Sequence, residues 1–327
     1  MPTTTPFALA DLEGAAALVR TVVPATPQYA WPLLASRTGA EVWVKHENHT
    51  PIGAFKLRGG LVYMDWLARS GPRPEGVVTA TRGNHGQSIA LAGRRTGLPV
   101  TILIPQGNSA EKNAAMAGFG AELIVHGRDF DEARAEAMRR AEERKLHFLP
   151  SFHPLLVKGV ATYALELFRA VGDLHTVYAP IGMGSGLCGL IAARDLLGLG
   201  TEIVGVVAAE APAVALSVEA GRPVPTPSAR TFADGMACRE PSAEAVAIIA
   251  KGAGRIVRVS EAEIAEAIRL LWAATHNVAE GAGAAALAAL MQERDRMRGK
   301  RVGVILSGGN IDTDVLCTVL AGRTPTA

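Results

Sequence analysis

The chain has 327 residues, of which 49% are hydrophobic and 20% charged; this composition excludes disordered and fibrous proteins and predicts about two domains. Its 33 basic and 31 acidic residues are interspersed, so neither a nucleic acid nor a membrane is expected as a partner. The first residues lack a basic and apolar leader and the cysteines (Cys188, Cys238 and Cys317) lie far apart, which predicts a cytoplasmic protein without disulfides.

From residue 41 onward, short β-branched runs alternate with longer helical patterns. The runs predict strands over 41–45, 77–80, 100–104, 122–125, 176–179, 202–208 and 301–305. Helices are predicted over 59–70, 86–96, 109–117, 129–145, 187–196 and 261–275. Such alternation is typical of α/β proteins with mostly parallel sheets covered by helices on both faces. Ligands bind such sheets at the carboxyl ends of the strands, so we examined the loops there.

The first of these loops is the segment HTPIGAFKLRGG, residues 49–60. Lys56 follows Phe55 and precedes a pair of glycines at the start of a predicted helix. A lysine that forms a Schiff base has to be partly desolvated, so that its amine is neutral near pH 7, and it has to stand on a rigid element. Lys56 meets both conditions, although an ordinary exposed loop lysine fits the same sequence.

The second loop is ATRGNHGQ, residues 80–87, which follows the strand predicted over 77–80. Backbone N–H groups at the start of the next helix attract anions, and Gly83 lets the backbone approach a ligand. Asn84 and His85 are therefore placed where a carboxylate or a phenolic oxygen would bind. A plain connection with Asn84 as helix N-cap remains open.

The third loop is IGMGSGLCG, residues 181–189, and its glycines free backbone N–H groups for a phosphate. The same residues read as GxGxxG, with Glu210 after the next strand, which also fits a dinucleotide site. A plain glycine turn is the third interpretation.

The fourth loop is LSGGNID, residues 306–312, where Ser307 either faces the cleft or caps a turn.

One cofactor would use all four loops. Pyridoxal phosphate needs an amine for its aldehyde, an amide beside its phenolic oxygen, a cradle for its phosphate and a partner for its ring nitrogen. A Rossmann dehydrogenase would explain the third loop alone.

With these motifs in this order, residues from about 24 to 318 resemble the serine/threonine dehydratase family of fold type II pyridoxal-phosphate enzymes. That family includes threonine dehydratases, serine racemases, and hydroxyaspartate and phenylserine dehydratases. EGAGAAALAAL, residues 280–290, also resembles it. The resemblance implies an α/β fold of tryptophan synthase β type, with two domains that are each a mostly parallel sheet flanked by helices. Residues 1–53 and 154–327 would form the large cofactor-binding domain, and residues 54–153 the small one.

The resemblance also implies a role for each motif. Lys56 would carry pyridoxal 5′-phosphate and then act as the base that removes the Cα proton. The cofactor ring would be contacted by Phe55, Asn84 at its 3-hydroxyl and Ser307 at its nitrogen. The phosphate would be held by Gly182, Met183, Gly184, Ser185 and Gly186. The substrate carboxylate would bind the loop of Thr81, Arg82, Gly83 and His85.

Three features depart from the family pattern. Met183 and Ser185 replace glycines of the phosphate loop. Arg82 stands where racemases carry a serine that acts on the second face, and because arginine is not a proton shuttle, racemisation is not expected. Arg82 would instead bind a second carboxylate, stack on an aromatic substituent or face the solvent. Glu210 matches only one of two acids that bind a cation in some members, so no metal is predicted.

The predicted function is the deaminating dehydration of a β-hydroxy-α-amino acid to a 2-oxo acid and ammonia, by a homodimer. Threonine or serine is the default substrate, with 3-hydroxyaspartate and phenylserine as acidic or bulkier analogues. Because Ser307 is neutral, the cofactor ring would be a weak electron sink, which favours prompt β-elimination. Racemisation, β-replacement, nicotinamide-dependent oxidoreduction and cofactor binding without turnover remain as alternatives.

Overall fold

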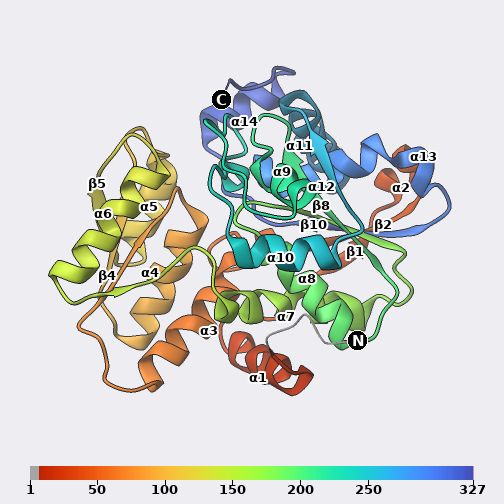
Figure 1. Cartoon of the computed structure of the whole chain (residues 1–327). Helices are drawn as coiled ribbons and strands as arrows, with labels where there is room; N and C mark the ends of the chain where they lie inside the picture. Colours follow the sequence, from red (N-terminus) through yellow and green to blue (C-terminus); the bar gives the residue numbers. More distant parts are fainter. Residues whose placement is uncertain (1–6, 327) are drawn as a thin grey trace.

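The computed structural model describes residues 7–326 and has two lobes, each built on a sheet of its own (Figure 1). In sheet order, the larger sheet consists of β1 (Gln28–Ala30), β2 (Glu41–His46), β10 (Arg301–Leu306), β7 (Thr176–Pro180), β8 (Glu202–Ala208) and β9 (Arg255–Val259). The smaller sheet consists of β5 (Glu122–Val125), β4 (Val100–Ile104), β3 (Val77–Ala80) and β6 (His147–Phe148). Only the β1–β2 pair is antiparallel among the described strands.

Helices cover both faces of each sheet (Figure 1). In the larger lobe, one face packs against α1 (Leu9–Arg20), α7 (Pro154–Ala170), α8 (Ser185–Leu196) and α10 (Ala243–Gly252). The other face packs against α2 (Pro32–Thr38), α11 (Glu261–Thr275) and α12 (Gly281–Gln292). In the smaller lobe, α3 (Lys56–Arg69) and α4 (Asn84–Thr96) lie opposite α6 (Phe130–Glu143). The remaining helices are η1 (Glu47–His49), α5 (Ala110–Gly118), α9 (Ala213–Ala220), η2 (Asp234–Met236), α13 (Arg294–Met297) and α14 (Thr313–Leu320).

The central strands are apolar on both faces because helices cover both. In β8, Val204 and Val206 belong to the cluster with α11 and α12, whereas Ile203 and Val207 belong to the cluster with α7 and α8. Strands buried in this way are near-continuous apolar runs, which is the pattern that predicted them. All seven predicted strands are present, each within one residue of its predicted ends.

Three strands and several helices carry no such pattern. β1 and β6 are only three and two residues long, and arginines at 255 and 258 interrupt the apolar residues of β9. Helix α7 is buried along most of its 17 residues, although its polar residues recur at helical spacing, at positions 158, 162, 166 and 169.

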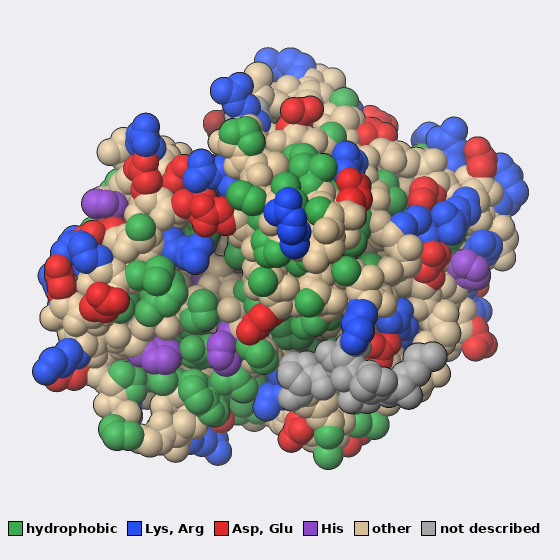
Figure 2. Space-filling view, viewed as in Figure 1, with side chains coloured by type: hydrophobic (Ala, Val, Ile, Leu, Met, Phe, Trp, Pro, Cys, Tyr) green, Lys and Arg blue, Asp and Glu red, His purple; other side chains and the backbone are tan. Residues whose placement is uncertain are grey.

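The strands of the smaller sheet all lie within residues 77–148, and those of the larger sheet all lie outside them. Helix α3 packs against α4 of one lobe and α7 of the other, so it stands at their junction. The division into residues 1–53 with 154–327 and residues 54–153 remains our proposal for the domain boundaries. Within residues 7–326, no helix has the length and apolar character needed to cross a membrane. Acidic and basic side chains intermingle on the face seen in Figure 2.

Candidate functional site

A cavity of about 340 Å³ lies where β3, β7 and β10 end, and its volume is in the range of small-molecule sites. Every residue predicted to bind the cofactor or the substrate lines this one cavity. They are Phe55, Lys56, Thr81, Arg82, Gly83, Asn84, His85, Gly182, Met183, Gly184, Ser185, Gly186 and Ser307. The fold therefore brings together four loops that are far apart in the sequence, with 252 positions between Phe55 and Ser307.

Lys56 is the first residue of α3, and its side chain lines the cavity beside the glycine-rich loop. Its Nζ donates to Ser185 Oγ at 3.4 Å and lies 5.1 Å from the centre of the Phe55 ring. Burial lowers the pKa of Lys56 to about 8, against the opposing effect of the Glu280 carboxylate. A substantial fraction of the amine is therefore neutral near physiological pH, as an amine that attacks an aldehyde requires.

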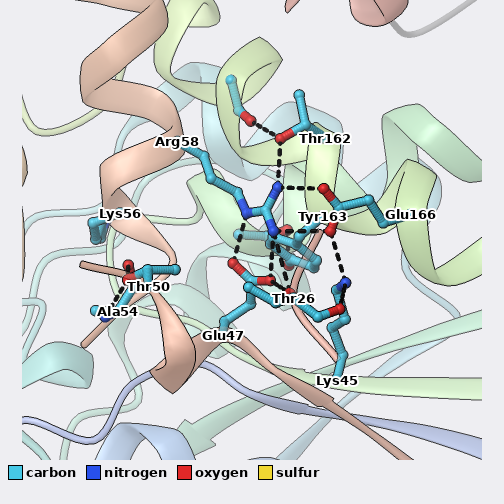
Figure 3. A network of polar contacts seen from close by, with 12 residues as sticks. Thr26, Lys45, Glu47, Thr50, Ala54, Lys56, Arg58, Thr162, Tyr163 and Glu166 are labelled. Atoms are coloured by element: carbon cyan, nitrogen blue, oxygen red, sulfur yellow. Dashed lines mark hydrogen bonds and ion pairs between the residues drawn. The ribbon is translucent and has the colours of Figure 1, made fainter. Parts of the chain in front are cut away.

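A buried ion cluster holds the first turn of α3 in place (Figure 3). Arg58 donates to Glu47 through Nε at 2.7 Å and Nη2 at 3.0 Å, and to Glu166 through Nη1 at 2.8 Å and Nη2 at 2.9 Å. Lys45 Nζ donates to the same Glu166 at 2.7 Å. The side chains of Arg58 and Lys45 have no exposed area. Because Arg58 is two residues from Lys56, this cluster fixes the base of the lysine relative to the larger lobe.

The loop before α4 is shaped by Thr81. Its Oγ1 accepts hydrogen bonds from the backbone N–H groups of Gly83 at 3.0 Å and Gly86 at 3.3 Å. Helix α4 starts at Asn84, and its N-cap residue, Gly83, has no side chain to cap it. Because Thr81 occupies the N–H of Gly86, the N–H groups of Asn84 and His85 are the ones available to an anionic group in the cavity.

His85 is buried in the same loop and is neutral. Burial, with a further contribution from the charge of Lys56, lowers its pKa to about 3. Its tautomer follows from its neighbour: Thr79 Oγ1 donates to the carbonyl of Leu149 at 2.8 Å, so its oxygen accepts from His85 Nε2 at 3.3 Å. His85 therefore carries its proton on Nε2.

The glycine-rich loop connects β7 to α8. Gly184 is the N-cap of α8 with φ of 98°, and no side chain caps this helix either. A Cβ at Gly182 would lie 2.1 Å from the carbonyl oxygen of Gly235, so only glycine fits there. An uncapped helix start reached by a tightly packed glycine backbone is a phosphate cradle. The Met183 sulfur accepts from Cys238 Sγ at 3.6 Å.

Ser307 follows the last residue of β10 and is buried. Its carbonyl accepts from the backbone N–H of Phe55 at 3.0 Å. This bond ties the serine directly to the segment that carries Lys56. Its uncharged hydroxyl suits a neutral ring nitrogen.

Arg82 and Glu210 have different surroundings. Arg82 is exposed on the cavity wall and forms no ion pair with any residue between 7 and 326. Glu210 is exposed after β8 and is not part of the wall. The described part of the chain holds no group of three or more His, Cys, Asp or Glu side chains placed to bind a metal.

Several charged residues of the wall were not among the predicted site residues, and three of them contact one another. Lys112 of α5 donates to Asp234 Oδ2 at 2.5 Å and lies 3.5 Å from Glu280 Oε2. Burial raises the pKa of Glu280 to about 7, against the effect of Lys112. Burial alone would lower the pKa of Lys112, but Glu280 and Asp234 hold it above its usual value. Glu280 belongs to the segment of residues 280–290 that resembles the family, but no local pattern assigns it a role.

Together these residues fit pyridoxal phosphate. The cavity offers a partly buried amine, a glycine cradle that a Cβ would fill, an amide and an uncharged hydroxyl. The dinucleotide interpretation of the glycine-rich loop leaves this amine without a function.

Comparisons with known proteins agree with this chemistry. The family described as pyridoxal-phosphate dependent enzyme matches residues 19–308. The L-threonine ammonia-lyase of Thermotoga maritima is 33% identical over 95% of this chain and 78% of its own length. The L-threo-3-hydroxyaspartate ammonia-lyase of Saccharomyces cerevisiae is 31% identical over 96% of both chains. A solved pyridoxal 5′-phosphate-dependent aspartate racemase superposes with a TM-score of 0.90 at 26% identity, over 97% of this chain and 99% of its own.

Proposed function

This chain belongs to the family of pyridoxal-phosphate-dependent enzymes, and from that premise we propose how its residues act on an amino acid. Its fold is type II, its cofactor is pyridoxal phosphate, and it is an ammonia-lyase of the dehydratase type. The motif-based prediction of the family is confirmed, and the nicotinamide alternative is set aside. The substrate is a β-hydroxy-α-amino acid, which the reaction converts to a 2-oxo acid and ammonia.

The observation that carries this proposal is the partly buried Lys56 amine, which lines the cavity in contact with Ser185 of the glycine-rich loop. When bound, pyridoxal phosphate withdraws the electron pair that remains when the Cα proton leaves. Lys56 takes that proton, because its pKa of about 8 is close to the working pH, where a general base is most effective. Ser185 accepts from the Lys56 amine and so orients it.

Two other loops orient the substrate and the ring in this proposal. The loop from Thr81 to His85, which leads into α4, binds the substrate carboxylate with backbone N–H groups. His85 is neutral, so the backbone N–H groups, and not an imidazolium, attract the carboxylate. Ser307 offers the ring nitrogen an uncharged partner, and the net result is loss of water across Cα–Cβ followed by hydrolytic release of ammonia.

Threonine and serine are the default substrates, and 3-hydroxyaspartate is favoured as an acidic one by the unpaired Arg82 on the wall. The similarity to an aspartate racemase favours racemisation as the second candidate. Arg82 argues against it, because a guanidinium stays protonated and does not supply a proton to the second face. Chiral analysis of unreacted amino acid distinguishes the two reactions.

We also propose that the enzyme is a cytoplasmic homodimer. Its three cysteines are all free, as expected in a reducing compartment. Large apolar side chains are exposed on β1, α2 and α11, namely Tyr29, Leu33 and Trp272. Exposed apolar residues on neighbouring elements are suited to a subunit interface. Sedimentation equilibrium tests the subunit count.

The test of the proposed function is a visible absorption spectrum of the purified protein, with 2-oxo acid assayed after serine, threonine, 3-hydroxyaspartate or phenylserine is added. We expect bound pyridoxal phosphate and oxo acid from at least one member. Replacing Lys56 by Ala should abolish turnover, whereas Lys251→Ala, at an exposed lysine of α10, should not. A Lys56→Ala protein with normal activity would refute the assignment.

A further inference from the structure

The side-chain amide of Asn84 is held at both ends. The backbone carbonyl of Ile52, which can only accept, receives a hydrogen bond from Asn310 Nδ2 at 2.7 Å. The second N–H of that amide donates to Asn84 Oδ1 at 2.7 Å. Asn84 must therefore present its nitrogen on the other side, where Nδ2 donates to Glu280 Oε1 at 2.7 Å. The orientation of Asn84 thus follows from a backbone group.

Glu280 is in turn fixed by its surroundings. Its side chain is 4% exposed, and its backbone N–H donates to the carbonyl of Gly308 at 3.1 Å. A Cβ at Gly308 would lie 2.6 Å from Glu280 Oε1, so the glycine of the SGGN segment leaves the space that this carboxylate fills. Lys112, which Asp234 anchors, faces the other carboxylate oxygen at 3.5 Å.

We propose that Glu280 and Asn310 are positioning residues that lock the amide of Asn84 with one N–H directed to the cofactor's 3-oxygen. An asparagine amide has two N–H bonds, and Glu280 uses one. The other remains for the cavity, which Asn84 lines. This inference rests on the proposed function, since it assigns how that site holds pyridoxal phosphate.

Lys112 extends the arrangement across the two lobes. It stands on α5 of the smaller lobe, whereas Glu280 and Asp234 belong to the larger one. Burial alone would favour the protonated carboxyl of Glu280, and Lys112 opposes this. Contact between the lobes therefore helps to keep Glu280 an acceptor for Asn84.

The substitution Glu280→Gln disturbs this lock while it preserves the size of the side chain. A glutamine amide has one oxygen, which faces either Asn84 Nδ2 or Lys112 Nζ. In either orientation, the glutamine NH₂ group faces another donor. If the oxygen turns to the charged Lys112, Asn84 loses its acceptor and its amide is free to rotate.

The experiment titrates the apoprotein with pyridoxal phosphate and, separately, with the analogue that lacks the 3-hydroxyl group. We expect Glu280→Gln to bind pyridoxal phosphate roughly ten- to hundredfold more weakly. This is the contribution of one hydrogen bond to a charged group, here the bond from the oriented Asn84 amide to the cofactor's 3-oxygen. The deoxy analogue should bind wild type and variant alike, because it has no 3-oxygen. In an Asn84→Ala background, Glu280→Gln should produce no further weakening.

Asn310→Ala provides a second variant with the same expected selectivity, in case Glu280→Gln does not fold. Glu293→Gln is the matched control, because Glu293 is a partly buried glutamate paired with Arg255 outside the cavity. Equal weakening of both ligands by Glu280→Gln would reveal a general structural role and overturn the inference, as would unchanged affinity for both. Failure of the wild-type protein to bind pyridoxal phosphate would instead refute the proposed function.

Discussion

Replacing Arg58 by Met should destabilise the protein more than any exposed arginine substitution does. Arg58 makes hydrogen bonds to both Glu47 and Glu166 and also donates to Thr26 and Thr162 at 3.2 and 3.1 Å. After the substitution, Glu166 keeps Lys45 as its partner at 2.7 Å. Glu47 keeps only the hydroxyl of Thr26. The variant thus buries a carboxylate that has lost its hydrogen-bonded cation and keeps only the more distant charge of Lys45.

The magnitude follows from that orphaned charge. Breaking a buried ion pair by removing one partner costs about 3–5 kcal/mol, because the remaining ion is neither hydrated nor paired. We therefore expect the free energy of unfolding to fall by about 3–5 kcal/mol. Removing the charge as well, in Arg58→Met with Glu47→Gln, should recover part of the loss, so the two substitutions should not be additive.

The assay is urea denaturation of the cofactor-free proteins at pH 7, so that ligand binding does not contribute to stability. Arg139→Met is the matched control: Arg139 also pairs with two glutamates, Glu136 and Glu143, but its side chain is 53% exposed. Exposed pairs contribute about 0–1 kcal/mol each, so the control should change stability little. Losses of equal size in Arg58→Met and Arg139→Met would refute the reasoning, since burial would then make no difference.

Two further predictions concern pH and substrate choice. Burial, with the charge of His49, lowers the pKa of His46 to about 4, so its contribution to stability is present above pH 6.5 and lost as pH falls from 6.5 toward 4. The substitution His46→Gln leaves a side chain that can still accept from Trp31, and it should reduce the loss of stability between pH 7 and 5 by about 2 kcal/mol. The free energies of unfolding are measured by urea denaturation at both pH values, and an equal loss in variant and wild type would contradict this. Arg82→Ala should lower kcat/KM for 3-hydroxyaspartate by roughly ten- to hundredfold and leave threonine nearly unaffected, because a charge-assisted bond contributes about 1.5–3 kcal/mol. An unchanged substrate profile would place Arg82 in the solvent instead.

Much of the fold was predictable because its central strands are buried on both faces. Runs such as 202–208 need no partner to be recognised, since helices on either side make every residue apolar. One helix was not among those predicted, although its sequence has a helical period. The polar residues of α7 recur at positions 158, 162, 166 and 169, but two of them, Thr162 and Glu166, are buried and bind Arg58 instead of facing the solvent.

The four loops of the candidate site were predictable for a related reason. Each follows a predicted strand and carries its chemistry within a few consecutive residues, as with Lys56 and Asn84. Parallel strands place such loops at one edge, so their convergence follows from topology. The roles of these residues toward cofactor and substrate remain predictions that the variants above test.

Side chains that act through distant partners were not predictable in the same way. Lys112 and Glu280 are 168 positions apart, and Arg58 and Glu166 are 108 apart. A charge within an apolar run, such as Glu166 in α7, does indicate that a partner exists, because an unpaired buried ion is too costly. The sequence does not indicate which partner it is, since Lys45 and Arg58 are equally good candidates on charge alone. In the structure, Lys45 and Arg58 both bind Glu166. With Glu47 they form a cluster of two cations and two carboxylates, which is electrically neutral. Its neutrality allows it to lie wholly inside the protein, next to the lysine whose own charge the cavity disfavours.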